Sequence, residues 1–558
     1  MVWAGTLAIV LGAELLTGAD AGALETREGI TGLSLESADY AWEALQQAHN
    51  ARTSQYALVG KTLALPQPGR GAHTIASPHP GHAESWDETE PPPGKRAREP
   101  ASPLQFAQFA LPPRTPQPVP GGAPRAPDEL FNTRYAERPI TQTLEFQYSY
   151  GSESAIEYRR NSDLNSKAQD NFLYVIPQVN GLIVYRPTDW VAFTLEMILD
   201  QAFPVQEPQY VTLPSGQLLF PPKSKPSLLV DQGYVTIRRI TDPLEFNLGR
   251  RNYEDNRHWL YDTSLDVFRA QLKVGHFQFE ASGGRQALWN LDVLQKEVKD
   301  RINTYIFYGE YRGIEDVKLG AYAIRRYDYN RQDGRPLNLG LRALGTPSDR
   351  FKYWAELAFL RGRDERSNKF RGHAIDVGGT YKLKGLPWEP NFTLGYAYGS
   401  GDGNPDDGVN NEFRQTGLES NEDRWAGLAK FKYYGEWLDP QLSNLEIFTV
   451  GFGFRPAPTV TVDLVYHWYQ LNQLADSVAG PVTAVMNQDD TQLSKKVGRE
   501  FDVVIGIRNV LGIRRLGIDL RMGWFYPGKA FRIEGGDPSD PTFRGADRGV
   551  SVIAKFWY

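Results

Sequence analysis

Basic side chains recur on one face of several predicted β-strands. Counting alternate residues along each strand places the following side chains on that face, pointing inward: Arg238, Arg251, Arg269, Lys273, Arg326, Arg342, Lys352, Lys382, Arg508 and Arg521. The guanidinium group is a planar fork that matches a carboxylate with two parallel hydrogen bonds. Several such groups at different heights would replace part of the hydration of passing carboxylates. These residues therefore predict weak, repeated binding of anionic groups.

The same side chains have a structural alternative. The interior of a large barrel needs charges that pair across strands and stiffen its wall. Acidic residues fall on the same face and are candidates to hold the basic side chains in place, namely Glu196, Asp376, Asp463, Asp502 and Asp519. For each single arginine, the sequence does not decide between a structural role in the barrel wall and a role in anion binding. The group as a whole favours binding.

The elements that must position these side chains alternate in polarity from Thr143 to the last residue. Every second residue is apolar in segments 143–150, 190–200, 460–468 and 516–524. A period of two residues places alternate side chains on opposite faces of a sheet. A soluble sandwich would bury the apolar face against a second sheet, whereas a membrane barrel turns it to lipid and keeps the polar face for a water-filled interior.

The lengths of the connections favour the membrane barrel. Strands are predicted to start near residues 141, 171, 189, 228, 244, 265, 276, 302, 315, 337, 350, 370, 390, 444, 459, 499, 514 and 549. Short turns such as 345–347 and 456–458 alternate with long connections such as 202–227 and 401–443, which is the outer-membrane pattern. The predicted fold class is all-β, a transmembrane antiparallel β-barrel of about 18 strands over residues 139–558. A barrel of that size leaves an aqueous channel.

The first 138 residues are predicted to be separate from the barrel. Residues 1–21 contain a short apolar run followed by Ala19-Asp20-Ala21, which predicts a secretory signal peptide. Residues 22–65 carry apolar side chains at helical spacing and predict a short periplasmic helical segment. Residues 66–138 are rich in proline and poor in aliphatic side chains, so a largely disordered linker is expected.

Composition and motifs exclude several functions. The 558 residues include no Cys, which removes thiolate catalysis and iron–sulfur clusters, and the net charge of −6 argues against a nucleic-acid partner. There is no nucleophile elbow, phosphate loop or HExxH motif, so we expect no enzyme, no catalytic residues and no cofactor. Four of the eight histidines lie in the predicted barrel and are scattered without metal spacing, namely His258, His276, His373 and His467. Residues 402–408 imitate the start of a calcium loop but lack its glycine and final glutamate, so no metal site is predicted.

Several segments resemble the alginate export family of outer-membrane porins. The clearest is Phe413–Asn421, followed at similar distances by Tyr434-Gly435-Glu436 and Leu464–His467. Leu248–Arg251 resembles the family's arginine-bearing strand, and Gly498–Asp502 and Phe525–Gly528 also match. Together the matches follow the family's order over most of residues 228–558.

The resemblance implies an 18-stranded barrel that exports an anionic, alginate-like polyuronate through an arginine-rich constriction, with loops that restrict access. It places Arg250 or Arg251 and Arg521 in that constriction. Four of the family's basic positions are occupied by other residues in this chain, namely Asp231, Thr380, Tyr398 and Asp519. That difference leaves the identity of the polymer open.

The sequence thus predicts a monomeric outer-membrane exporter with several partners. These are the anionic polysaccharide, outer-membrane lipid, the barrel assembly machinery and periplasmic synthesis or scaffold proteins. A passive porin for small anions or oligosaccharides is the alternative, and an adhesin with a plugged interior is a third class. A segment 401–443 folded over the mouth would favour gated export, and an open mouth would favour the porin.

Overall fold

The structure is a computed structural model. It describes residues 136–139, 144–150, 154–162, 164, 171–206, 211–212, 218–219, 225–238, 243–288, 291–294, 302–329, 334–482, 484, 486–487, 493–531 and 547–558. The predicted signal peptide, helical segment and most of the proline-rich linker lie outside these residues. Within the described part of the chain, no helix has the length and apolar character needed to cross a membrane.

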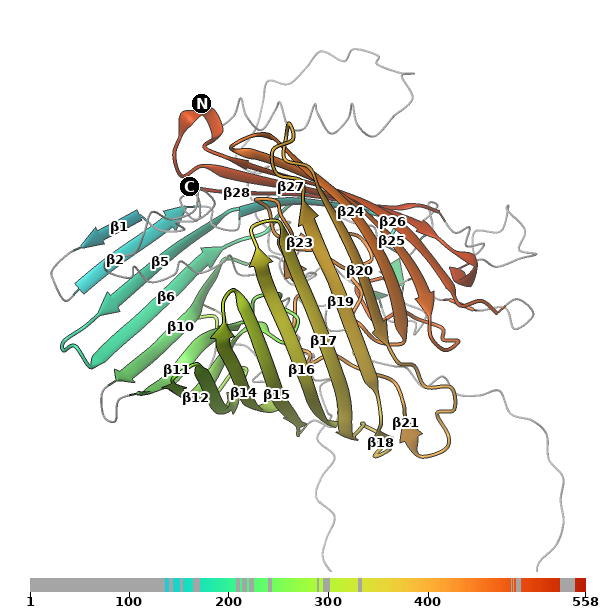
Figure 1. Cartoon of the computed structure of the whole chain (residues 1–558), viewed down its shortest axis with the longest axis horizontal. Coiled ribbons are helices and arrows are strands. Elements are labelled where there is room, and N and C mark those ends of the chain that lie inside the picture. The colour runs from blue at the N-terminus through green and yellow to red at the C-terminus, as the bar shows by residue number, and fades with distance from the viewer. Residues whose placement is uncertain are drawn as a thin grey trace, which may run out of the picture. The chain divides into compact units, whose positions relative to one another are not determined.

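The described residues form one large sheet of 24 strands and two small sheets of two strands each (Figure 1). The N-terminal strands of the large sheet are β1 (Ala136–Pro139), β2 (Leu144–Tyr150), β3 (Ser154–Arg160), β4 (Phe172–Ile176), β5 (Gln178–Tyr185), β6 (Val191–Asp200) and β7 (Phe203–Gln206). The middle strands are β10 (Ser227–Arg238), β11 (Leu244–Glu254), β12 (Asp262–Val274), β13 (Phe277–Arg285), β14 (Ile302–Ile314), β15 (Val317–Asp328), β16 (Arg335–Ser348), β17 (Phe351–Arg363) and β18 (Lys369–Phe370).

The C-terminal strands complete the large sheet. They are β19 (His373–Lys382), β20 (Asn391–Gly399), β21 (Val409–Asn410), β24 (Leu445–Ala457), β25 (Val460–Leu471), β26 (Lys496–Arg508), β27 (Gly517–Pro527) and β28 (Gly549–Trp557). The small sheets pair β8 (Val211–Thr212) with β9 (Leu218–Leu219) and β22 (Glu422–Asp423) with β23 (Phe431–Lys432). Two short 3-10 helices are η1 (Val510–Gly512) and η2 (Lys529–Phe531).

The long strands pair with their neighbours in sequence, and almost every pair is antiparallel. From β10 to β17 each strand pairs with the next, and the series continues through β19, β20, β24, β25, β26, β27 and β28. At the N-terminal side, β6 pairs with both β5 and β10. The last strand, β28, pairs with β27 and also with β3 of the N-terminal side.

The sheet contains more strands than the sequence predicted. Three predicted strands are each divided in two, as β2 and β3, β4 and β5, and β6 and β7. The other additions are β1, β18 and β21, which have four residues or fewer. Strands this short show no readable period, and the β18–β21 pair is parallel, unlike the long strands.

The two faces of the sheet have opposite polarity, as the alternation predicted. One face exposes large apolar side chains, including Leu394 at 59%, Phe392 at 50% and Phe448 at 47%. The side chains that alternate with them are buried and mostly polar, such as Thr393 on β20 and Thr449 on β24. We call these the apolar face and the polar face of the sheet. Burial of the polar face requires something to cover it.

Candidate functional site on the polar face

The connection between β20 and β24, residues 400–444, folds onto the polar face. We call it the inserted segment. Its start, residues 403–408, is exposed, but its larger apolar side chains are fully buried, namely Phe413, Phe431, Trp437, Leu438 and Leu442. It bonds to side chains or backbone groups of β3, β15, β16, β17, β19, β25, β26 and β27. This segment therefore covers the face on which the basic residues were predicted.

Arg521 on β27 binds two carboxylates of the inserted segment. Its Nε and Nη2 donate to the two oxygens of Glu436, both at 2.8 Å, and its Nη1 donates to Glu422 at 3.1 Å. All three side chains are 3% exposed or less. Burial would raise the pKa of Glu422, but the charge of Arg521 outweighs it and holds the pKa well below its usual range. Glu422 is therefore ionised, and both carboxylates are paired with one arginine.

Other basic residues of the polar face hold the segment too. Lys352 on β17 forms an ion pair with Asp423 at 2.8 Å. Arg508 on β26 donates to the carbonyl oxygen of Leu428 at 2.6 Å and pairs with its neighbour Asp519. Arg326 on β15 donates to the carbonyl oxygen of Thr416 at 3.2 Å. Basic side chains from distant strands thus converge on the inserted segment.

Acidic residues of the same face accept hydrogen bonds from the segment. Glu500 on β26 accepts from the backbone N–H groups of Trp437 at 2.5 Å and Leu438 at 3.1 Å. Asp376 on β19 accepts from the hydroxyl of Tyr434 at 2.8 Å and pairs with Arg257 at 2.8 Å. These carboxylates satisfy donors that the segment would otherwise bury without partners.

Glycines on the strands make room for the segment's tryptophans. A Cβ atom at Gly549 would lie 2.1 Å from Cε2 of Trp437, and one at Gly451 would lie 2.5 Å from Cζ3 of Trp425. Trp437 stacks on Phe525 of β27 with ring centroids 4.8 Å apart. The surface of the sheet is therefore shaped to fit the inserted segment.

The connection between β11 and β12 supports the segment from a second side. His258 is fully buried, and its ring contacts Glu254 and Asp262, each at 2.8 Å. Its backbone carbonyl accepts from the N–H groups of Ser420 and Asn421. Burial would lower the pKa of His258, but the carboxylates raise it to about 10 despite the nearby Lys430 ammonium. The imidazole is therefore charged at neutral pH.

The remaining predicted site residues lie at different places. Arg342 is buried between Glu356 and Asp255, and Arg269 is buried beside Glu280. Arg251 is partly buried and donates to Asn247 at 3.0 Å. Arg238 pairs with Glu245 at 2.8 Å and is 47% exposed, and Lys273 is exposed at the end of β12.

Arg250, one of the two alternatives that the resemblance gave for the constriction beside Arg251, does not share the polar face. It is fully buried and donates to both oxygens of Asp266, at 2.7 and 2.8 Å. Leu248 precedes Arg250 by two residues and so points to the same face of β11. Leu248 pairs with Phe268 of β12, and both of these apolar side chains are exposed. The backbone N–H of Leu288 also donates to Asp266. This arginine therefore lies on the apolar face under a covering segment.

Sequence reasoning missed the acidic partners and one arginine. Glu422, Asp423 and Glu436 belong to the inserted segment, and Arg257 lies in the β11–β12 connection, outside any alternating strand. A signal for the segment was present, because residues 413–442 contain many large apolar side chains that a solvated loop would not need. In the described ranges, no group of three or more His, Cys, Asp or Glu side chains is arranged to hold a metal ion.

A sequence model of the alginate export family matches residues 138–544. The alginate production protein AlgE of Azotobacter vinelandii is 26% identical over 200 residues, which cover 33% of this chain and 40% of that protein. AlgE of Pseudomonas syringae pv. tomato is 23% identical over 355 residues, which cover 54% of this chain and 66% of that protein. The chain thus spans less than half the length of the first of these relatives.

Solved structures similar to this chain include outer-membrane proteins of Pseudomonas aeruginosa. OccK9 (OpdG) has a TM-score of 0.48 and 11% identity, covering 75% of this chain and 97% of its own. OpdK has a TM-score of 0.46 and 10% identity, covering 75% and 99%. The family match covers most of the chain, and the protein belongs to the alginate export family as a largely antiparallel, all-β protein of the Gram-negative outer membrane.

Proposed function

We propose that this protein exports an anionic, alginate-like polyuronate across the outer membrane. In this proposal the large sheet closes into a barrel of about 18 long strands, and the polar face lines its lumen. The pairing of β6 with β10 and of β3 with β28 supports closure, because N-terminal strands then border both ends of the series from β10 to β28. An aqueous interior follows from a barrel of that size.

One observation carries the proposal. Basic side chains of the polar face hold carboxylates that belong to a connection and not to the strands, as in the pairs of Arg521 with Glu422 and Glu436 and of Lys352 with Asp423. A face that binds the carboxylates of a peptide segment offers the same forked donors to the carboxylates of a uronate chain. The inserted segment then acts as a gate that occupies these sites at rest.

Opening exchanges one set of carboxylates for another. As the inserted segment leaves, polymer carboxylates take the places of Glu422, Asp423 and Glu436, so Arg521 and Lys352 are not left uncompensated. Conduction requires that no single site hold the polymer for long. Neighbouring acids such as Asp519, which pairs with Arg508 at 2.6 Å, weaken each site and favour release.

The passive porin remains the competing function. A porin for small anions requires an open path, whereas here the inserted segment is packed on the polar face with its largest side chains buried. That packing favours gated polymer export. We further propose that the chain is a monomer and that it acts as a channel and not as an enzyme. In this proposal the barrel assembly machinery inserts it into the membrane. Periplasmic synthesis or scaffold proteins then deliver the polymer.

Single-channel recording in a planar bilayer tests the function. We expect anion selectivity in the reversal potential under a salt gradient, and block by oligomannuronate but not by neutral dextran. Arg508→Gln and Arg521→Gln should weaken the block, while Arg514→Gln, at an exposed arginine outside the polar face, should not. Anion current that is indifferent to oligomannuronate would support the porin instead.

A further inference from the structure

A cluster of basic side chains lies on the apolar face of β15 to β18. It comprises Arg325, Arg335, Arg361, Arg363 and Lys369, all exposed, and we call it the outer basic cluster. The ladder brings them together because Leu337 pairs with both Arg325 and Arg361, and Arg363 pairs with both Arg335 and Lys369. The same face of these strands exposes Leu339 at 36% and Leu341 at 57%.

These cations have no carboxylate partner among the described residues. Arg335 lies over the Tyr327 ring at 4.3 Å, and Arg361 lies over the Phe359 ring at 5.6 Å. Arg363 donates to the carbonyl oxygen of Ser367 at 2.9 Å. Aromatic rings and a backbone carbonyl therefore orient the guanidinium groups, and within the described ranges no acid compensates their charge. By contrast, Arg342, Arg508 and Arg521 of the polar face are paired with acids.

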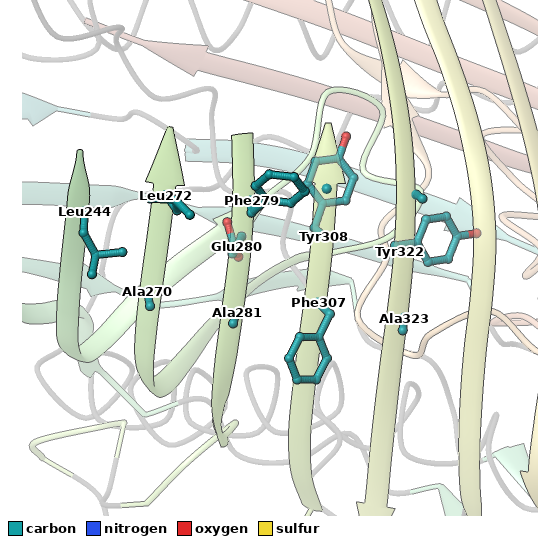
Figure 2. Close-up of a pocket in the computed structure, with 12 residues that line it drawn as sticks. Leu244, Ala270, Leu272, Phe279, Glu280, Ala281, Phe307, Tyr308, Tyr322 and Ala323 are labelled. Carbon is teal, nitrogen blue, oxygen red and sulfur yellow. The ribbon is translucent and has the colours of Figure 1, made fainter. Parts of the chain in front are cut away.

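An apolar pocket of about 550 Å³ lies on the adjoining strands. Figure 2 shows its lining residues on the neighbouring strands β11 to β15. The exposed rings of Phe279 and Phe307 flank small residues of the apolar face, namely Ala281, Gly309, Ala321 and Ala323. Ala323 precedes Arg325 by two residues on β15, so both side chains are on one face, about 7 Å apart along the strand.

We propose that this surface binds a phosphorylated lipid of the outer membrane, with its phosphates on the outer basic cluster and an acyl chain in the pocket. Arginine recognises phosphate with the same paired donors that it offers to carboxylate, and basic clusters at a membrane surface attract anionic headgroups. The chemical class that fits both halves is a lipid A-like phosphoglycolipid. A uronate chain carries anions but has no apolar part for the pocket.

Lipid binding to the purified full-length protein in detergent tests this inference. Native mass spectrometry would compare bisphosphorylated lipid A with its dephosphorylated form. The variant Arg325→Gln/Arg361→Gln/Arg363→Gln should bind bisphosphorylated lipid A roughly tenfold to a hundredfold more weakly. Dephosphorylated lipid A should bind weakly to both proteins. The matched control is Arg350→Gln, an exposed arginine in the turn at the other end of β16 and β17, which should bind like the parent.

A second variant tests the pocket separately. Ala323→Phe fills the space beside Phe307 and should lower the affinity for lipid A while the outer basic cluster stays intact. Equal affinity of the triple arginine variant and the parent would overturn the proposal. Displacement of lipid A by oligomannuronate at equal concentration would also overturn it, because the polymer would then be the occupant. Neither result depends on whether the protein exports a polymer.

Discussion

At the scale of single residues, the charge on Arg521 is compensated by groups far away in the sequence. Glu422 and Glu436 meet it from the inserted segment, and the three side chains exclude almost all solvent. Removing one member of a buried ion pair leaves an uncompensated charge, which costs more than the pair contributes. Arg521, Glu422 and Glu436 therefore stabilise the packed segment only when all three are present.

We expect Arg521→Met to lower the free energy of unfolding by about 3–5 kcal/mol, because two buried carboxylates lose their cation. The triple variant Arg521→Met/Glu422→Gln/Glu436→Gln should recover most of that loss. Urea unfolding followed by tryptophan fluorescence measures both. Equal stability of the single and triple variants would contradict the ion-pair account.

His258 gives the packing of the segment a pH dependence. Its pKa in the folded protein is raised to about 10 from an ordinary value of 6.5, since Asp262 and Glu254 outweigh burial and Lys430. A raised pKa means that the contribution to stability is fully present below pH 6.5 and is lost as the pH rises through 10. The Tm difference between the parent and His258→Gln should therefore shrink from pH 6 to pH 10.5. A difference that is constant with pH would show that the imidazole is not charged in the fold.

Residue identities on the polar face were predictable, but their partners were not. Strand alternation is enough to place Arg342 and Arg521, because the period of two fixes the face. It does not reveal that Arg521 meets Glu436, since that contact depends on the path of a connection without a period. The resemblance left Arg250 and Arg251 as alternatives, and only Arg251 follows the parity of the polar face.

At the scale of elements, the inserted segment and the strands are fitted to each other. Gly549 and Gly451 leave room for Trp437 and Trp425, and a Cβ at either position would overlap an indole ring. Such a fit requires small residues on strands that are far apart in the sequence. The inserted segment therefore has one defined position on the sheet.

Gly549→Ala should displace Trp437 and destabilise the packed segment by about 1–3 kcal/mol. The matched control is Gly181→Ala on β5, where nothing lies within 4 Å of the added Cβ atom. Limited proteolysis of the inserted segment measures the effect, with faster cleavage expected in the first variant only. Similar cleavage rates in both variants would mean that Trp437 does not hold the segment.

The positions of the long strands could be predicted, and the packing of their connections could not. Alternation marks β11, β17 and β25 because each is long enough to show several periods. The packing of residues 400–444 onto the polar face depends on contacts with many strands at once. The same is true of the short strands β18 and β21. Large apolar side chains in that segment were the one available signal.

At the scale of the whole molecule, the two faces of the sheet differ in chemistry. The polar face holds carboxylates through paired arginines, and the apolar face carries exposed aromatic and aliphatic side chains. We propose that the first face transports polymer and that the second contacts lipid. In this proposal, uronate carboxylates replace those of the inserted segment on the polar face.

Release of sugars from proteoliposomes tests that claim most directly. Vesicles containing the parent or the variant Glu422→Gln/Glu436→Gln would be loaded with oligomannuronate and with neutral dextran of the same size. We expect oligomannuronate to leave faster than dextran through both proteins. It should leave faster through the variant than through the parent, because the segment of the variant no longer occupies Arg521. Equal release rates for the two sugars would contradict it.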